Sequence, residues 1–245
     1  MTAAAIAATA PARVDVGWVV SSTIRVITRR SLDLLILGLP FIIVPGALGN
    51  LFPPELGVLR LVTGLPGLIF IGGASLMTYR ELSGADRLGL GAVISAGARR
   101  FGTLWGIAWV SNVATLLGAL LLLVPGIIVA VGWMPASTAA MVEDKRTFEA
   151  LDEAWRLTSG SRWRLFGLLC IALAAAAVLV LVVVAAGAVL GLTLGPETGQ
   201  RVGEVTVAPL FAFAIQTIST VGAAAAYAGL RRAKEGAFGV AEVFA

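Results

Sequence analysis

The sequence predicts an all-α polytopic membrane protein with about six transmembrane helices and with interfacial amphipathic helices on the cytoplasmic side. Of the 245 residues, 58% are hydrophobic and only 13% are charged, whereas about a quarter of the residues of a soluble domain carry charge. Several apolar segments approach the roughly 20 residues that a helix needs to cross a bilayer. A third observation is a unit that occurs three times, an amphipathic stretch with arginines followed by two long apolar segments.

The three amphipathic junctions divide the chain. They read VVSSTIRVITRRSLDLLI (19–36), AVISAGARRFGTLWGI (92–107) and EALDEAWRLTSGSRWRLFG (149–167). Residues 1–12 have no basic stretch before their small residues, which favours a short disordered lead over a signal peptide. A single membrane domain is expected over residues 13–245.

The spans follow from the apolar runs, and we expect them at 32–52, 58–79, 103–123, 127–142, 165–192 and 205–230. The fourth is short, and Pro135 interrupts it. The basic pairs Arg99–Arg100 and Lys145–Arg146 require an even number of crossings between them, since basic loops stay on one side. A tight turn at Pro125–Gly126 would join spans three and four. A re-entrant hairpin is the alternative.

Interfacial helices are expected at 14–30, 88–101 and 147–160. In the first, one face carries Val16, Val20, Ile24 and Ile27, and the other carries Ser21, Ser22, Arg25 and Arg29, which is the helical period. The second is weaker because its glycines lower helix propensity. Helices of this kind lie in the membrane interface. The alternative is that they only extend the spans that follow.

The third interfacial helix has the clearest pattern. Thr147 is expected to cap it, and Asp152 and Arg156 are spaced for an i,i+4 pair. Its apolar face carries Phe148, Leu151, Trp155 and Thr158. Tryptophan on such a face is expected at headgroup depth.

The distribution of basic residues predicts the orientation. Of the 18 lysines and arginines, all but Arg60 and Arg201 fall on one side of the six spans, so both termini are expected to be cytoplasmic. The amino-acid usage suggests a bacterial inner-membrane protein. Contacts with anionic lipid headgroups are expected from Arg29, Arg30, Arg99, Arg100, Trp155, Arg162, Trp163 and Arg164. The bilayer is the expected partner, and nucleic acid is not, because the basic residues form no continuous patch.

The side chains that usually carry chemistry are scarce. The chain has no histidine and one cysteine, which removes the commonest general base and any thiolate metal cluster. No catalytic residue, metal site or cofactor is therefore expected. Among the carboxylates, Asp33 comes closest to mid-membrane, two residues into the first span, and it is expected to reach Arg29 or Arg30 at the interface.

Two polar side chains lie within the spans, Asn112 in the third and Gln216 in the sixth. Prolines interrupt the first, second, fourth and sixth spans. Broken helices can build a cavity in a transporter, and Asn112 and Gln216 would then be the candidate substrate contacts. The alternative is ordinary helix packing, with the amides bonding to neighbouring helices.

The stretch from Val124 to Gly167 resembles the glycerophosphoryl diester phosphodiesterase membrane-domain family and its YciC-like bacterial relatives. The positions that carry the resemblance are Pro125, Gly126, Pro135, Glu143, Glu149, Ala150, Trp155, Leu157, Thr158, Gly160, Trp163 and Arg164. The chain departs from the pattern at Asp152, Glu153 and Ala154, where the family often has a base and a serine. The phosphodiesterase domain that gives the family its label is not expected within these residues. The resemblance thus implies an accessory membrane module.

These observations favour a non-catalytic integral inner-membrane protein, an accessory or scaffolding component of envelope or lipid-related processes. It would act with a membrane protein partner or as a homo-oligomer. The alternative is a small transporter or lipid-handling protein with a cavity between proline-broken helices. An enzyme is the third hypothesis, and it has no catalytic motif in its support.

Overall fold

The computed structural model describes residues 14–121 and 123–235, and in these ranges the chain is helical with no strand. The expected lead at residues 1–12 lies outside them. The first half of the chain contains α2 (Val16–Arg29), α3 (Ser31–Gly38), a π-helix (Leu39–Ile43), α4 (Val44–Leu51), a 3₁₀ turn (Pro54–Leu56), α5 (Gly57–Gly64), α6 (Gly67–Ser83) and α7 (Leu90–Arg99). The second half contains α8 (Phe101–Leu121), α9 (Leu123–Trp133), α10 (Ala136–Val142), α11 (Thr147–Thr158), α12 (Arg162–Leu194), α13 (Pro196–Val202), a π-helix (Gly203–Val207) and α14 (Ala208–Glu235).

Six segments are long and apolar enough to cross a membrane, as the sequence predicted. They are Ser31–Leu51, Val62–Ser83, Phe101–Leu120, Val124–Val142, Arg162–Leu194 and Pro196–Lys234. The expected spans agree with them to within a few residues, except at the sixth, which extends to Pro196 because α13 and a π-helix continue into α14. The fold class is therefore confirmed.

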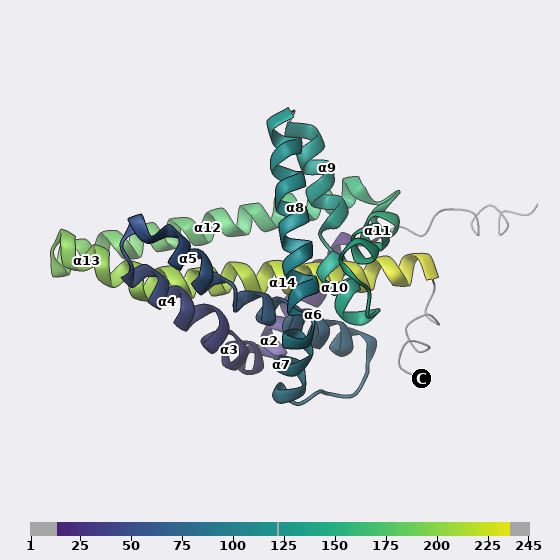
Figure 1. Ribbon diagram of the computed structural model, residues 1–245, viewed down its shortest axis with the longest axis horizontal. Helices are drawn as coiled ribbons and strands as arrows, with labels where there is room; N and C mark the ends of the chain where they lie inside the picture. The colour runs from purple at the N-terminus through teal and green to yellow at the C-terminus, as the bar shows by residue number, and fades with distance from the viewer. Residues whose placement is uncertain (1–13, 122, 236–245) are drawn as a thin grey trace, which may run out of the picture.

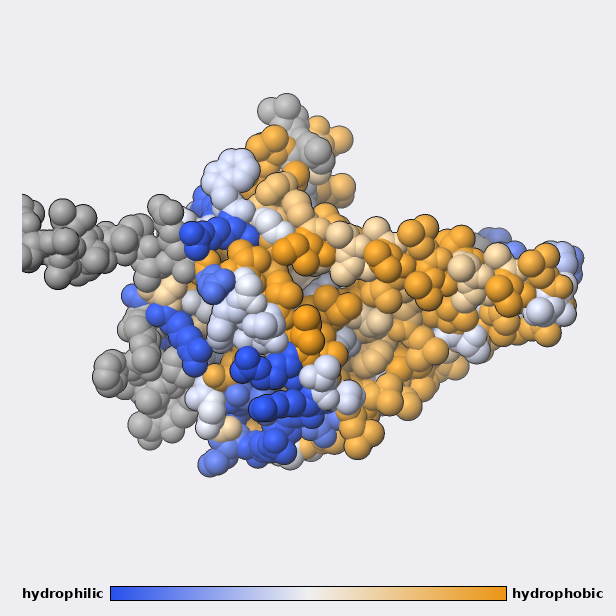
Figure 2. All heavy atoms as spheres, turned by 180° about the vertical axis from the view of Figure 1, so that it is seen from behind, coloured by the Kyte–Doolittle hydropathy of each residue, from blue (hydrophilic) through white to orange (hydrophobic). Residues whose placement is uncertain are grey.

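Helix α14 is the centre of the molecule. It contacts α2, α4, α6, α10, α11 and α12. Helices α12 and α14 lie along the long axis, with α13 at its far end (Figure 1). Hydrophilic residues gather at the opposite end, and apolar residues cover most of the body between the two ends (Figure 2). Helix α11 and the loop before it, which carry Glu143, Lys145 and Glu153, lie at this end (Figure 1). This charged end is called the polar end below.

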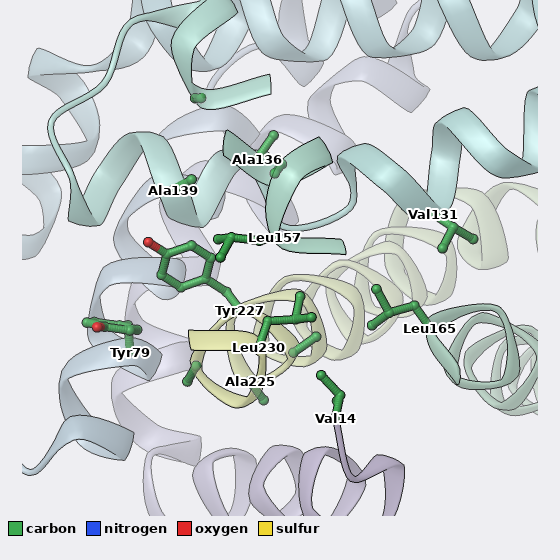
Figure 3. Close-up of a cluster of buried hydrophobic side chains, with 14 of the residues drawn as sticks. Val14, Tyr79, Val131, Ala136, Ala139, Leu157, Leu165, Ala225, Tyr227 and Leu230 are labelled. Atoms are coloured by element: carbon green, nitrogen blue, oxygen red, sulfur yellow. The ribbon is translucent and has the colours of Figure 1, made fainter. Parts of the chain in front are cut away.

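The packed core lies towards the polar end. One buried cluster joins α14 to α11, α10 and the start of α12, and it contains Tyr79, Leu157, Leu165, Tyr227 and Leu230 (Figure 3). A second cluster joins α2, α3, α6, α7 and α14 through residues such as Val26, Phe70 and Val93. In the most apolar window of α12 only 6% of the residues are buried. The long helix thus presents its surface to its surroundings.

Helices α8 and α9 form a hairpin that stands across the direction of α12 and α14 (Figure 1). The sequence did not predict this crossing. Helix α8 packs through its first half, where Leu104 and Ile107 are buried, whereas Leu116 and Leu120 near its end are exposed. The limbs are in close backbone contact, since a Cβ on Gly118 would lie 2.9 Å from the Cα of Gly126.

The turn of this hairpin differs from the prediction. Pro125 and Gly126 lie inside the first turns of α9, not in the connection, because a proline near a helix start loses no hydrogen bond. Gly126 is buried where the limbs meet. The predicted interruption at Pro135 is confirmed, since α9 ends at Trp133 and α10 begins at Ala136.

The other prolines also coincide with irregular helix. Pro40 lies in the first π-helix, Pro66 lies between α5 and α6, and Pro209 follows the second π-helix. Proline removes a backbone donor and clashes with the preceding turn, so the helix must widen or break there. All four proline-bearing spans are distorted at or next to a proline.

Each stretch expected to be interfacial forms a separate helix, and none simply continues into the following span. Arg30 separates α2 from α3, and Arg100 separates α7 from α8, with similar backbone angles (φ −116° and −98°). Residues Ser159–Ser161 separate α11 from α12. In α7, the glycine that weakened the prediction has a packing role. A Cβ at Gly97 would lie 2.7 Å from the carbonyl oxygen of Ile69.

The faces of α2 and α11 differ from those predicted. In α2, Ser22 was placed on the polar face and is fully buried beside Val19 and Val26. In α11, Leu151 and Thr158 are buried against the protein, whereas Phe148 is 74% exposed. These helices pack onto the bundle, so periodicity alone could not separate a face for protein from a face for lipid.

Candidate functional site

Asn112 and Gln216, the two predicted intramembrane contacts, do not converge. Asn112 is exposed on α8, and its amide nitrogen donates to the carbonyl oxygen of Ala108 one turn earlier (2.7 Å). Gln216 is half-buried on α14 and donates to the hydroxyl of Thr220 (3.2 Å). Only Gln216 borders the cavities described next.

A first cavity of about 280 Å³ lies where two proline-distorted spans meet α14. The π-helix of the first span contributes Phe41 and Ile42, and the break between α5 and α6 contributes Gly64 and Gly67. Gln216 lies on its wall with Asn50 and Thr63. Asn50 itself donates to the carbonyl oxygen of Glu204 (2.6 Å), which ties α4 to the second π-helix.

A second cavity of about 250 Å³ shares Leu68, Ile71 and Gln216 with the first. It extends to the break between α9 and α10, where Met134 and Ser137 lie on its wall. Ser111, also on this wall, has a buried hydroxyl without a hydrogen-bond partner. Such an orphaned group is costly and is often explained by water or a ligand.

The chemistry of the two cavities is neutral. Their walls carry amides and hydroxyls among apolar side chains, and no ionisable residue lines them. Amides and hydroxyls can hold water or an uncharged polar solute by hydrogen bonds. They cannot act as a general acid or base near neutral pH. The arrangement can therefore hold a neutral solute by hydrogen bonds.

An ionic cluster at the polar end joins α10, α11 and α14. Lys145 lies 2.5 Å from Glu143 and 2.8 Å from Glu153, and Arg231 lies 3.2 Å from Glu143. Tyr227 donates its hydroxyl to Glu143 as well. The exposed fractions of the Glu143 and Glu153 side chains are 14% and 11%. The sequence did not predict this cluster, although Glu143 is among the positions of the resemblance and Lys145 and Arg146 follow it by two and three residues.

The cluster shifts the titration of its members outside the spans. Burial by itself lowers the pKa of Lys145, but the hydrogen bonds that Lys145 donates to Glu143 and Glu153 outweigh it and hold the pKa above its ordinary value of 10.5. Burial raises the pKa of Glu153, but its bonds to Arg156 and Lys145 outweigh burial and keep the pKa below 4.5. Both groups are thus held in their charged forms.

Arg30 and Arg100, predicted to meet lipid headgroups, are instead paired within the protein. Arg30 is buried and bonds to Glu81 (2.7 Å) and Asp33 (2.8 Å), as was expected for Asp33. Burial lowers the pKa of Arg30, but these two carboxylates outweigh it and raise the pKa. Arg100 bonds to Asp144. Arginines at helix breaks thus fasten the bundle, which the sequence pattern could not distinguish from lipid contact.

The remaining predicted headgroup contacts divide into two groups. Arg29, Arg99, Trp163 and Arg164 are exposed, and Arg164 also donates to the carbonyl oxygen of Val14 (2.9 Å). Trp155 is half-buried. It packs against Gly132 and Trp133, and the guanidinium of Arg162 covers its ring.

The family-pattern positions have structural roles. Glu149 accepts a hydrogen bond from the backbone nitrogen of Arg146 (3.0 Å), which caps α11. Thr147 is the first residue of this helix, not its cap, and its hydroxyl donates to Thr103 in α8. Ala150, Leu157 and Thr158 are buried against the bundle. The guanidinium of Arg156, which was predicted to pair with Asp152, lies 2.5 Å from the carboxylate of Glu153, three residues earlier in the helix.

Comparison of the chain with protein-family models, with curated proteins and with solved structures found no match. The family resemblance of the Val124–Gly167 stretch therefore remains an expectation from its pattern. No group of three or more acidic, cysteine or histidine side chains in the described ranges could hold a metal ion. What the site offers must be argued from its own geometry.

Proposed function

We propose that this chain is a non-catalytic integral membrane protein that serves as an accessory or scaffolding component of envelope or lipid-related processes. We place it in a bacterial inner membrane with both termini cytoplasmic, so that the polar end faces the cytoplasm. The basic residues outside the spans support this orientation. The bilayer and its anionic headgroups are the proposed surroundings, with a membrane protein or a second copy as partner.

One observation carries the proposal. Most of the half-buried and buried ionisable side chains form ion pairs with one another. Large apolar helix surfaces, in contrast, are not covered by other parts of the chain. The most apolar windows of α12 and α8 are 6% and 17% buried, against 28–44% for the other four spans. The ion pairs of these clusters stabilise the fold. Uncovered helix surface is what a membrane protein offers to a neighbour.

The α8–α9 hairpin is the surface to test. A photo-crosslinking amino acid would replace Leu117, which is 53% exposed. The proposal expects a discrete crosslinked protein product in native membranes. A second position, Val189, which is 58% exposed on α12, tests the other uncovered surface, and a product from Leu117 alone locates the partner at the hairpin. Crosslinks to lipid alone at both positions would count against a scaffolding role.

The second function is that of a small transporter or lipid-handling protein. The specific observation in its favour is that both cavities beside Gln216 lie at proline-distorted helix, as in transporters with broken helices. Purified protein in proteoliposomes would be tested for flux of uncharged polar solutes and of lipid. Flux that is lost in Gln216→Ala but kept in Asn112→Ala would support it. No flux above that of empty liposomes would remove it.

A further inference from the structure

Arg162 differs in its hydrogen bonding from the other arginines that are at least half-buried in the described ranges. Arg30, Arg80, Arg100 and Arg231 each donate to an oxygen of the protein. The Nε of Arg162 is buried without a hydrogen-bond partner, and no carboxylate of the described residues pairs with its guanidinium. A buried donor of this kind calls for an acceptor that the chain does not supply.

The position of the Arg162 guanidinium is fixed. Its carbon lies 3.8 Å from the centroid of the Trp155 ring, a cation–π contact that holds one face of the planar group. Trp155 is itself held, because a Cβ at Gly132 would lie 2.5 Å from its ring. The edge of the guanidinium, which carries the N–H donors, remains for an anion. Arginine binds phosphate through two such donors at once.

The guanidinium lies on the wall of an apolar cleft between α9 and the start of α12. The cleft has a volume of about 280 Å³. Its other walls are Val124, Ile127, Ile128 and Val131 from α9 and Trp163 and Phe166 from α12. Both helices belong to segments that can cross a membrane. One cation beside an otherwise apolar cleft matches an amphiphile with an anionic head and a hydrocarbon tail.

The backbone adds to this complementarity. Arg162 is the first residue of α12, a helix of 33 residues, and the preceding Ser161 makes no side-chain cap. The amides of a helix start favour negative charge. Trp163 beside the cleft is 87% exposed, and tryptophan prefers the headgroup level of a bilayer. An anion bound to Arg162 would therefore lie at the headgroup level of a bilayer.

We propose that the cleft between α9 and α12 is a binding site for one anionic phospholipid. The phosphate bonds to the guanidinium edge of Arg162, and an acyl chain lies along Ile127, Ile128 and Phe166. The occupant is a membrane lipid and not free phosphate, because the walls of the cleft are apolar. The site depends on membrane insertion of the protein and holds for either function proposed above.

Native mass spectrometry of the purified protein in mild detergent tests the site. Phosphatidylglycerol or phosphatidylcholine is titrated in, and retention of one lipid is measured as the collision energy rises. The expected result is that one phosphatidylglycerol binds at least tenfold more tightly than phosphatidylcholine, the ratio that about 1.4 kcal/mol gives. Arg162→Gln should lose this preference. Arg162→Lys should keep part of it, because a lysine still supplies the charge.

The controls separate the site from general attraction and from misfolding. Arg87→Gln removes an exposed charge in the loop between α6 and α7 and should leave binding unchanged. Ile128→Trp fills the cleft and should weaken binding of the lipid while Arg162 is intact. Thermal unfolding without added lipid identifies variants that fail to fold. Equal retention of both lipids, no loss in Arg162→Gln, or competition by millimolar inorganic phosphate would overturn the proposal.

Discussion

The hydroxyl of Tyr227 in α14 donates a hydrogen bond to the carboxylate of Glu143 at the end of α10. This bond joins the last span to the fourth at the polar end. Glu143 also accepts from Lys145 and pairs with Arg231. One carboxylate therefore holds two spans and the connection to α11 together.

Loss of the Glu143 carboxylate should cost more stability than loss of the Tyr227 hydroxyl. Tyr227→Phe removes one hydrogen bond and should lower the free energy of unfolding by about 1 kcal/mol. Glu143→Leu removes the carboxylate that pairs with Lys145 and Arg231 in a largely buried site. It should lower the free energy of unfolding by about 3 kcal/mol. Thermal unfolding in detergent micelles measures both. Equal, small shifts would show that the cluster adds little.

The stability of the protein should depend on pH at two limits. The pKa of Glu153 is depressed below 4.5, so its contribution is complete above that pH and is lost as the pH falls through the folded-state pKa. The pKa of Lys145 is raised above 10.5, so its contribution is complete below that pH and is lost at higher pH. Melting temperatures should be level between the limits. In Glu153→Gln the acid-side loss should shrink, and an unchanged acid limb would contradict the pairing.

Glycine at position 132 should be required by the ring of Trp155. A Cβ there would lie 2.5 Å from that ring, and such overpacking costs about 2 kcal/mol. Gly132→Ala should therefore lower the melting temperature. The matched control is Gly167→Ala, also within a helix, where a Cβ meets nothing within 4 Å. It should be neutral or stabilise by up to about 1 kcal/mol. The same loss in both variants would contradict this packing.

The orientation of α11 can be checked with two apolar residues that the sequence placed on one face. Leu151 is 3% exposed and Phe148 is 74% exposed. Leu151→Ala should cost about 3 kcal/mol of unfolding free energy. Phe148→Ala should change it by less than about 0.5 kcal/mol, as is usual for exposed positions. A larger loss of unfolding free energy in Phe148→Ala than in Leu151→Ala would contradict the observed orientation of α11.

The hairpin of α8 and α9 separates the spanning prediction from the re-entrant alternative. In a Cys170→Ser background, a cysteine at Leu120 would be labelled in intact cells with a membrane-impermeant maleimide. Spanning limbs expose Leu120 on the same side as a control cysteine at Glu197 in α13. A cysteine at Asp86 should label only after permeabilisation. If the cysteine at position 120 is labelled neither in intact nor in permeabilised cells, the hairpin stays inside the bilayer.

The sequence predicted the number of apolar segments and, except for the start of the sixth, their approximate bounds, because length and hydropathy determine them. It also located the helix distortions, since proline acts through its own missing donor. The pairing of Arg30 with Glu81, 51 residues away, could not be read from a local pattern. The same holds for Gly132 against Trp155. Periodicity marked α11 as amphipathic, but lipid and a protein core attract the same apolar face.

The candidate site was predicted in part. Gln216 was identified because an amide within an apolar span is unusual, and the prolines suggested a cavity. Asn112 met the same criteria but bonds to its own helix. Which face of α8 turns outward depends on the hairpin direction, and no local signal encodes that direction. The ionic cluster at Glu143 was missed because its members come from three separate elements.

Native mass spectrometry of the protein, released gently from its own membranes, tests the central proposal most directly. The account predicts a stoichiometric complex with a membrane protein, held through the α8–α9 hairpin and lost when Leu116 and Leu117 are both replaced by serine. Bound phospholipid is compatible with this result. A protein that is released without any protein partner, retaining only lipid or a small solute, would contradict the scaffolding role and favour the transport function at Gln216.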